Sequence, residues 1–251
     1  MSLDTHTLLN LICGEMKNNY TIITDDTELK KFIKWLPELK ENETYYCCLF
    51  ARSKYCKDIK HIKSDKAQLK RFTSSKGRLF HKIKQLECEI GSYTQRASGN
   101  NIDIPQEALA MYITINPRDM FKATSEGAKK LMDLALSGNS GFNPHQEILS
   151  EIQKAKGTKY FIDLDFDVRD EFRKKCILKE ISSILLPNEY TILDTRGGFH
   201  ILIHLKNIRE SISKIWYKQI TSIPECDICG DNMIPIPGTY QGGFTPKIYL
   251  I

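Results

Sequence analysis

The sequence predicts an α+β fold in which strands pair antiparallel. Three observations lead to this fold class. Hydrophobic residues make up 41% and aromatic residues 10% of the 251 residues, which is enough to form a core and excludes a disordered chain. Helical and strand-like patterns follow one another without strict β-α-β repetition. Residues 190–205 carry two apolar runs around Arg196-Gly197-Gly198, the pattern of a β-hairpin.

Local patterns place each element along the chain. Apolar residues at helical spacing predict helices over 27–36, 64–72, 122–136, 146–155 and 169–186. Compact apolar or aromatic runs predict strands over 43–51, 108–116, 159–167 and 247–251. Residues 78–90 fit a helix or a strand, whereas 93–101 and the Gly- and Pro-rich part after Pro224 predict loops. The apolar face of the helix over 169–186 is expected to hold Phe172, Cys176, Ile177, Ile181, Ile184 and Leu185.

Positive charge is concentrated in one part of the chain. The formal net charge is +5. Between Arg52 and Leu86, twelve Lys and Arg residues accompany two acids, a local net charge of +10, so that the rest of the chain carries −5. This asymmetry predicts a basic surface for a polyanion such as a nucleic acid or a nucleotide phosphate. A lysine-rich surface that is merely solvated is the alternative.

The cysteines argue against a disulfide-rich secreted protein, and the hydropathy argues against a membrane protein. Eight cysteines without a repeated spacing do not form the pattern of a disulfide-rich secreted chain. Only Cys226-x-x-Cys229 has zinc-ligand spacing, and because no second such pair follows, a zinc site is the less favoured interpretation. The apolar runs are too short to cross a bilayer, and no basic stretch precedes residues 8–13. We therefore expect an intracellular chain, cytoplasmic or nuclear, with no membrane partner.

The most informative motif lies in the strand predicted over 159–167. Side chains alternate between the two faces of a strand, so Asp163, Asp165 and Asp167 would share the face opposite the core. Like charges two residues apart repel one another, and carboxylate oxygens are the ligands that Mg²⁺ and Mn²⁺ prefer. Asp163 and Asp165 are therefore candidate ligands of ions that align an attacking hydroxyl with a nucleoside triphosphate. An edge strand whose acids face water is the alternative.

The second motif is the predicted hairpin turn and the strand after it. Gly197 and Gly198 are expected to adopt positive φ in a tight turn and to let a phosphate approach the backbone. Arg196 can chelate a phosphate through its guanidinium group. His200 follows the turn and can donate a hydrogen bond to a triphosphate. A hairpin with a structural histidine is the alternative, and His204 is expected to be structural.

The third segment, residues 226–239, adds two acids in a Gly- and Pro-rich stretch. Asp227 and Asp231 both precede Pro237-Gly238-Thr239. Either carboxylate would complete a three-carboxylate metal site. A surface turn is the alternative.

In this order, the three motifs resemble those of the archaeo-eukaryotic primase superfamily, the catalytic domain of primases and primase-polymerases. Asp163-Leu164-Asp165 resembles its DxD or DxE strand, and Gly198-Phe199-His200 its small-x-His hairpin. Pro237-Gly238-Thr239 resembles the turn that follows its hydrophobic-Asp element. Residues 115–119 are similar to a strand end of phage and plasmid primase-polymerases. The motifs span more than half of the chain.

The resemblance implies an RRM-like antiparallel sheet as the catalytic core, over residues 106–251. A smaller α/β module over residues 1–105 would precede it and carry the basic segment that faces nucleic acid. The implied activity is template-directed nucleotidyl transfer, which makes primers on single-stranded DNA from nucleoside triphosphates. A separate helicase or replication protein is an expected partner, since no helicase-like P-loop follows the motifs.

The resemblance also implies roles for individual residues. Asp163, Asp165 and Asp227 would hold two Mg²⁺ or Mn²⁺ ions, Asp227 being favoured over Asp231 because of its place after Cys226. His200 would contact the triphosphate, near Arg196 and the amides of Gly197 and Gly198. The arginine that the family often carries before its Pro-Gly turn is missing, and Arg118, Lys122 or Arg196 would replace it.

Two other functions stay open. The first is a metal-dependent nuclease or a replication-initiation nickase, although His200 and His204 are farther apart than the paired histidines of such nickases. The second is a catalytically inactive module that binds single-stranded nucleic acid. In such a module, the bases of the nucleic acid would stack on aromatic residues near basic positions, namely Tyr45, Tyr46, Phe72 and Phe80.

Overall fold

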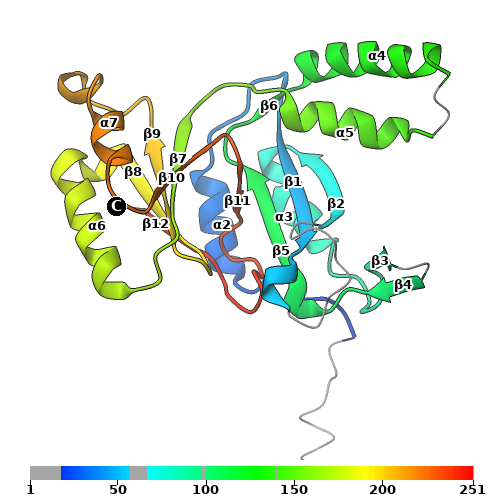
Figure 1. The fold of residues 1–251 in the computed structure, drawn as a ribbon, viewed down its shortest axis with the longest axis horizontal. Helices are drawn as coiled ribbons and strands as arrows, with labels where there is room; N and C mark the ends of the chain where they lie inside the picture. The colour runs from blue at the N-terminus through cyan, green and yellow to red at the C-terminus, as the bar shows by residue number, and fades with distance from the viewer. Residues whose placement is uncertain (1–17, 57–66, 98–99, 139–140, 251) are drawn as a thin grey trace, which may run out of the picture.

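The computed structural model describes residues 18–56, 67–97, 100–138 and 141–250 (Figure 1). These residues form a mixed α+β fold in which the named strands pair antiparallel, as the sequence predicts. The helices are α2 (Asp26–Trp35), α3 (Leu79–Lys84), α4 (Met120–Leu136), α5 (Pro144–Lys154), α6 (Glu171–Ile184) and α7 (Trp216–Thr221). None of the described helices is long and apolar enough to span a membrane.

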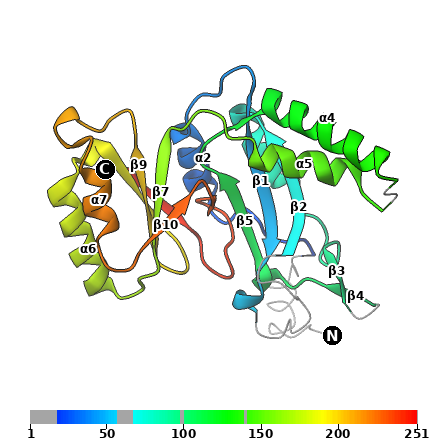
Figure 2. The same ribbon diagram turned by 45° about the horizontal axis from the view of Figure 1, so that its top comes forward.

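Two five-stranded sheets lie side by side, with α2 between them (Figures 1 and 2). The first contains β1 (Glu43–Ala51), β2 (Ala67–Ser74), β5 (Leu109–Thr114), β6 (Arg118–Asp119) and β11 (Met233–Pro235). The second contains β7 (Phe161–Phe166), β8 (Tyr190–Asp194), β9 (Phe199–His204), β10 (Cys226–Gly230) and β12 (Lys247–Leu250). A separate hairpin is formed by β3 (Thr94–Ala97) and β4 (Asn100–Asp103).

The first sheet, of order β11-β5-β1-β2, is built around a strand that is buried on both faces. All nine residues of β1 are buried. Alternate side chains enter two cores: Tyr45, Cys47 and Leu49 pack in the core that includes α2, and Tyr46 and Cys48 in the core that includes α4 and α5. Burial on both faces explains why the sequence of this strand is a continuous apolar run rather than an alternation.

The second sheet, of order β10-β7-β9-β8-β12, has α6 and α7 on one face. Its first four elements along the chain are β7, α6, β8 and β9, and α7 and β10 follow. Ile177 and Ile181 of α6 and Ile220 of α7 pack with Leu164 and Ile201 in one core. The opposite face of β7 and β9 carries the acids and His200, because strand side chains alternate. Part of that opposite face packs on α2.

Three predictions of local secondary structure are wrong. Residues 64–72 were expected to be helical; residues 64–66 lie outside the described residues, and 67–72 belong to β2, which pairs with β1 and sets Phe72 opposite Cys47. The stretch 93–101 is largely hairpin β3–β4, and the part after Pro224 contains β10 and β11. In each case the hydrogen bonds of a neighbouring strand decide the conformation, which local periodicity does not contain. Phe172 is 77% exposed and does not join the apolar face of α6.

The sheets do not follow the expected division of the chain at residues 105/106. Strands β5 and β11 lie beyond that position, and both belong to the first sheet, where β5 pairs with β1 and β11 with β5. The C-terminal part of the chain therefore contributes to both sheets.

Candidate functional site

The strand register of the second sheet gathers the predicted site residues. Asp165 of β7 lies opposite His200 of β9 and opposite Asp227 of β10. Side chains at directly opposite positions of antiparallel strands share a face and approach closely. Asp163, two residues earlier on β7, shares this face. Residues from three separate parts of the sequence thus form one acidic cluster, which we define as Asp163, Asp165, Asp167, Asp227 and His200.

His200 is held between two carboxylates. Its Nδ1 atom lies 2.8 Å from Oδ1 of Asp163, and its Nε2 atom lies 3.5 Å from Oδ1 of Asp165. Burial by itself lowers the pKa of this histidine, but the neighbouring charge of Asp163 and the hydrogen bond to it outweigh burial and raise the pKa. The carboxylates on either side therefore favour the protonated form of this histidine.

The cluster contains more negative charge than His200 can balance. Burial raises the pKa of Asp165 first, and repulsion from Asp163, Asp167 and Asp227 raises it further, against the attraction of His200. The second oxygen of Asp163, Oδ2, is buried without a hydrogen-bond partner. A buried carboxylate oxygen without a partner is costly in free energy. Both observations make the cluster a candidate cation site.

Divalent cations fit this set of donors only in part. Among the residues that the structure describes, no group of three or more His, Cys, Asp and Glu side chains is arranged to hold one ion. Mg²⁺, however, is usually bound by one or two carboxylates together with substrate phosphates rather than by a cage of protein ligands. The free Oδ2 of Asp163 and the adjacent carboxylate of Asp165 supply such a pair.

The cysteines of β10 belong to no group of three or more possible metal ligands among the residues that the structure describes. Burial and the nearby acids raise the pKa of Cys226 to about 11 and that of Cys229 to about 12. The Cys229 thiol lies 3.9 Å from Oδ2 of Asp165. Seven cysteines of the described part are free thiols.

The acidic cluster opens into a cleft of about 140 Å³ at the edge of the first sheet. The opposite wall is cationic and aromatic, and it contains Arg52, Lys54, Tyr55, Tyr112 and Gln241. Arg52 is only 4% exposed, and its Nη1 donates to the Tyr112 hydroxyl over 2.6 Å. A cleft with carboxylates on one wall and cations on the other suits a ligand that carries phosphates and binds with a divalent ion.

The glycines of the hairpin turn do not have the backbone conformation that the sequence predicts. Gly197 and Gly198 are not among the glycines with positive φ, so that prediction is wrong. Gly198 is needed for space: a Cβ there would overlap the Phe166 carbonyl oxygen and lie 2.7 Å from the Val168 nitrogen. Glycine is therefore required at position 198 because the turn packs closely against the end of β7, and not because the backbone has a positive φ there.

Arg196 lies against the opposite wall of the cleft. Its guanidinium is 4.5 Å from the centre of the Tyr55 ring, and its backbone N–H donates to Gln241 Oε1 over 2.9 Å. The Gln241 amide also donates to the Tyr55 hydroxyl over 3.0 Å. These contacts join the hairpin turn to the first sheet and hold Tyr55 in place.

Arg118 and Asp231 form a separate buried pair. The Arg118 guanidinium binds the Asp231 carboxylate and donates to the Asp231 carbonyl oxygen over 3.2 Å. Asn116 Nδ2 donates to the same carboxylate over 3.1 Å. Asp231 is thereby neutralised away from the cluster, whereas Asp227 is exposed directly opposite Asp165. The arrangement favours Asp227 as the third carboxylate and leaves Arg118 a structural partner.

Sequence reasoning missed the wall opposite the acids. Arg52 was assigned to the basic segment but not to the site, and Tyr112 and Gln241 carried no local signal. Only the packing of β1 and β5 beside the second sheet brings them to the cleft. Comparisons of the chain with protein-family models, with curated proteins and with solved structures found no match.

Proposed function

We propose that this chain is a template-directed nucleotidyltransferase of the primase or primase-polymerase type, which makes primers on single-stranded DNA. The observation that carries the proposal is the acidic cluster, in which Asp163 and Asp165 flank His200 on one sheet face and Asp227 of the next strand lies opposite Asp165. A cationic wall faces this cluster across the cleft.

The topology of the second sheet supports the same proposal. The element order β-α-β-β-α-β, with the strands β10, β7, β9 and β8 in that spatial order, agrees with the arrangement expected of an RRM-like sheet. Both helices pack on one face, and the candidate catalytic residues occupy the other. An RRM-like catalytic core is therefore part of the proposal.

Each residue of the cluster has a chemical role in this proposal. The carboxylates of Asp163, Asp165 and Asp227 hold Mg²⁺ or Mn²⁺ together with the phosphates of a nucleoside triphosphate. When bound, such ions stabilise the charge that develops as a 3′-hydroxyl attacks the α-phosphorus and pyrophosphate leaves. Asp163 fixes Nδ1 of His200. Nε2, at 3.5 Å from Asp165, is then free to donate to a phosphate oxygen.

The cationic wall positions the nucleotide. Arg52 is buried and held by the Tyr112 hydroxyl, so its guanidinium is preorganised rather than mobile. Together with Lys54, it places positive charge opposite the acids. Preorganised cations stabilise the charge of a leaving polyphosphate at little reorganisation cost.

A primer-synthesis assay tests the proposed function. Wild-type chain, single-stranded DNA, Mg²⁺ or Mn²⁺ and labelled nucleoside triphosphates are expected to give extended products. The variant Asp163→Asn/Asp165→Asn should lose about 10²-fold or more of this activity. The matched control is Asp133→Asn, which alters an exposed acid on α4.

Two results would overturn the proposal. Full synthesis by the double variant would remove the acids from the mechanism. Cleavage of DNA without any triphosphate, abolished in the double variant, would assign the same cluster to a nuclease instead.

A further inference from the structure

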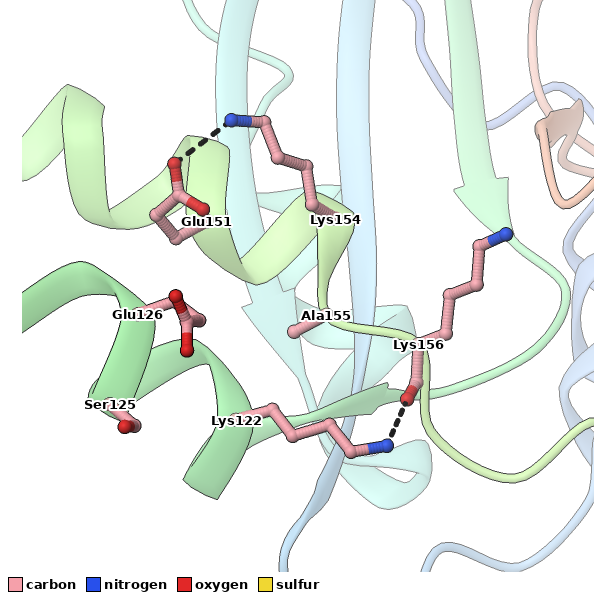
Figure 3. A pocket seen from close by; sticks show the side chains of 7 residues that line it. All are labelled: Lys122, Ser125, Glu126, Glu151, Lys154, Ala155 and Lys156. Carbon is pink, nitrogen blue, oxygen red and sulfur yellow. Dashed lines mark hydrogen bonds and ion pairs between the residues drawn. The ribbon is translucent and has the colours of Figure 1, made fainter. Parts of the chain in front are cut away.

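A series of hollows leads from the acidic cluster along α5. Asn232 and Met233 line both the cleft and a neighbouring hollow of about 460 Å³. Lys154 connects that hollow to a pocket of about 450 Å³ beside α4 and α5 (Figure 3). Lys156 connects this pocket to a third hollow, which Lys159 also lines. Successive hollows thus share lining residues, and we name the three hollows outside the cleft, taken together, the basic groove.

This basic groove has an excess of positive charge. Its lining contains six cationic side chains and three carboxylates: Arg71, Arg118, Lys122, Lys154, Lys156 and Lys159, and Glu126, Glu151 and Asp231. Two of these acids pair with groove cations, Lys154 and the buried Arg118, so the excess charge comes from the other four cations. Asp231 binds Arg118, and Glu151 lies 2.9 Å from the Lys154 ammonium and 3.4 Å from that of Lys130.

Three lysines of the groove lie at the end of α5 and in the connection that follows it. Lys154 is the last residue of α5, and Lys156 and Lys159 lie in the connection from α5 to β7, the strand of Asp163 and Asp165. All three lysine side chains are exposed. In Figure 3 the lysines at 122, 154 and 156 surround the pocket, and the Lys122 ammonium donates to the Lys156 carbonyl oxygen over 3.1 Å. The positive charges thus follow the chain toward the acidic cluster.

Several other groups of the groove are neutral and polar. Gln68, Ser150, Gln153 and Asn232 line the hollow nearest the cleft. Arg71 is fixed there by donating to Ser150 Oγ over 3.1 Å. Point charges at intervals, separated by amides and hydroxyls, match a strand of phosphates and bases better than a compact anion.

We propose that the basic groove binds the sugar-phosphate backbone of single-stranded DNA and leads the strand to the acidic cluster. The proposal rests on the proposed function and deepens it by giving the path of the strand. It adds a nucleic-acid contact beyond the basic segment that the sequence indicates, and Gln68 and Arg71 of that segment line the groove as well.

Binding of a fluorescent oligodeoxythymidylate at several salt concentrations tests the proposal. The variant is Lys154→Gln/Lys156→Gln, and it removes two charges from the groove. The matched control is Lys175→Gln/Lys179→Gln, which removes two exposed charges from α6 on the far side of the second sheet. A comparison variant, Lys70→Gln/Lys84→Gln, removes two exposed charges from the sequence-predicted segment.

The groove variant should bind more weakly, and its slope of log K against log salt should fall by about 0.7 for each phosphate that it no longer neutralises. The control should retain the wild-type affinity and slope. Wild-type affinity in the groove variant, or an equal weakening in the α6 control, would overturn the proposal. So would a weakening confined to the Lys70→Gln/Lys84→Gln variant.

Two readouts separate this proposal from the proposed function. If the wild-type chain extends primers while the groove variant binds DNA normally, DNA binding by the groove is refuted and the nucleotidyltransferase function is supported. If the groove variant no longer binds DNA while the wild-type chain incorporates no nucleotide, DNA binding by the groove is supported and the nucleotidyltransferase function is refuted.

Discussion

Nδ1 of His200 lies 2.8 Å from Oδ1 of Asp163, although 37 positions separate the two residues in the sequence. The antiparallel register of β7 and β9 creates this contact, because it sets Asp165 opposite His200 and Asp163 one pleat away. The pair is buried, and it fixes which nitrogen of the imidazole faces the cleft. The cluster therefore depends on the sheet as much as on its residue types.

The first prediction concerns the coupling between these two residues. The variants Asp163→Asn and His200→Gln and their combination should show an interaction free energy of about 0.5–3 kcal/mol in urea unfolding, because the side chains share one buried hydrogen bond. The control cycle combines Asp133→Asn with His200→Gln and should be additive. Additive effects in the Asp163–His200 cycle would contradict the contact.

The second prediction separates the two later aspartates. Asp227→Asn should lower primer synthesis with little loss of stability, because Asp227 is exposed beside Asp165. Asp231→Asn should instead destabilise the fold by up to about 3–5 kcal/mol, because it leaves the buried Arg118 without its charge partner. Thermal unfolding and synthesis assays on both variants check this. The opposite assignment of effects would move the third metal ligand to Asp231.

The third prediction uses the glycine pair of the hairpin. Gly198→Ala should destabilise the fold by about 1–3 kcal/mol, because its Cβ would overlap the backbone at the end of β7. Gly197→Ala should cost less, because its Cβ would meet only the Asp167 carboxylate oxygen, at 3.0 Å. Chemical denaturation of both variants measures the difference. Equal stabilities would show that packing does not select glycine at position 198.

The fourth prediction concerns pH. Burial lowers the pKa of His204 below its ordinary value of 6.5. The unfolded chain therefore binds a proton at this histidine more readily than the folded chain, so its contribution to stability is present above pH 6.5 and is lost as pH falls through the folded pKa. An NMR titration should give a midpoint below 6.5 for the ring at position 204. A midpoint above 6.5 would contradict burial of the neutral ring.

Local sequence patterns were sufficient where an element carries its own signal. The strand over 43–51 and the helix beginning near residue 27 are predicted closely, since the first is a continuous apolar run and the second ends before Pro37. The acids at 163 and 165 were likewise evident from alternation. Residues 64–72 were not, because pairing with β1 overrides their helical pattern.

The sequence by itself determined the chemical inventory of this protein: an α+β composition, alternating carboxylates on one strand, a histidine after a glycine turn and an uneven distribution of charge. The tertiary structure decided which of these groups meet. It placed Asp227 opposite Asp165 and paired Asp231 with Arg118. It also placed Arg52 and Gln241 on the wall of the cleft that faces the acids. The physical reason is that strand register and the packing of two sheets are long-range properties, and no local pattern encodes the partner of a strand.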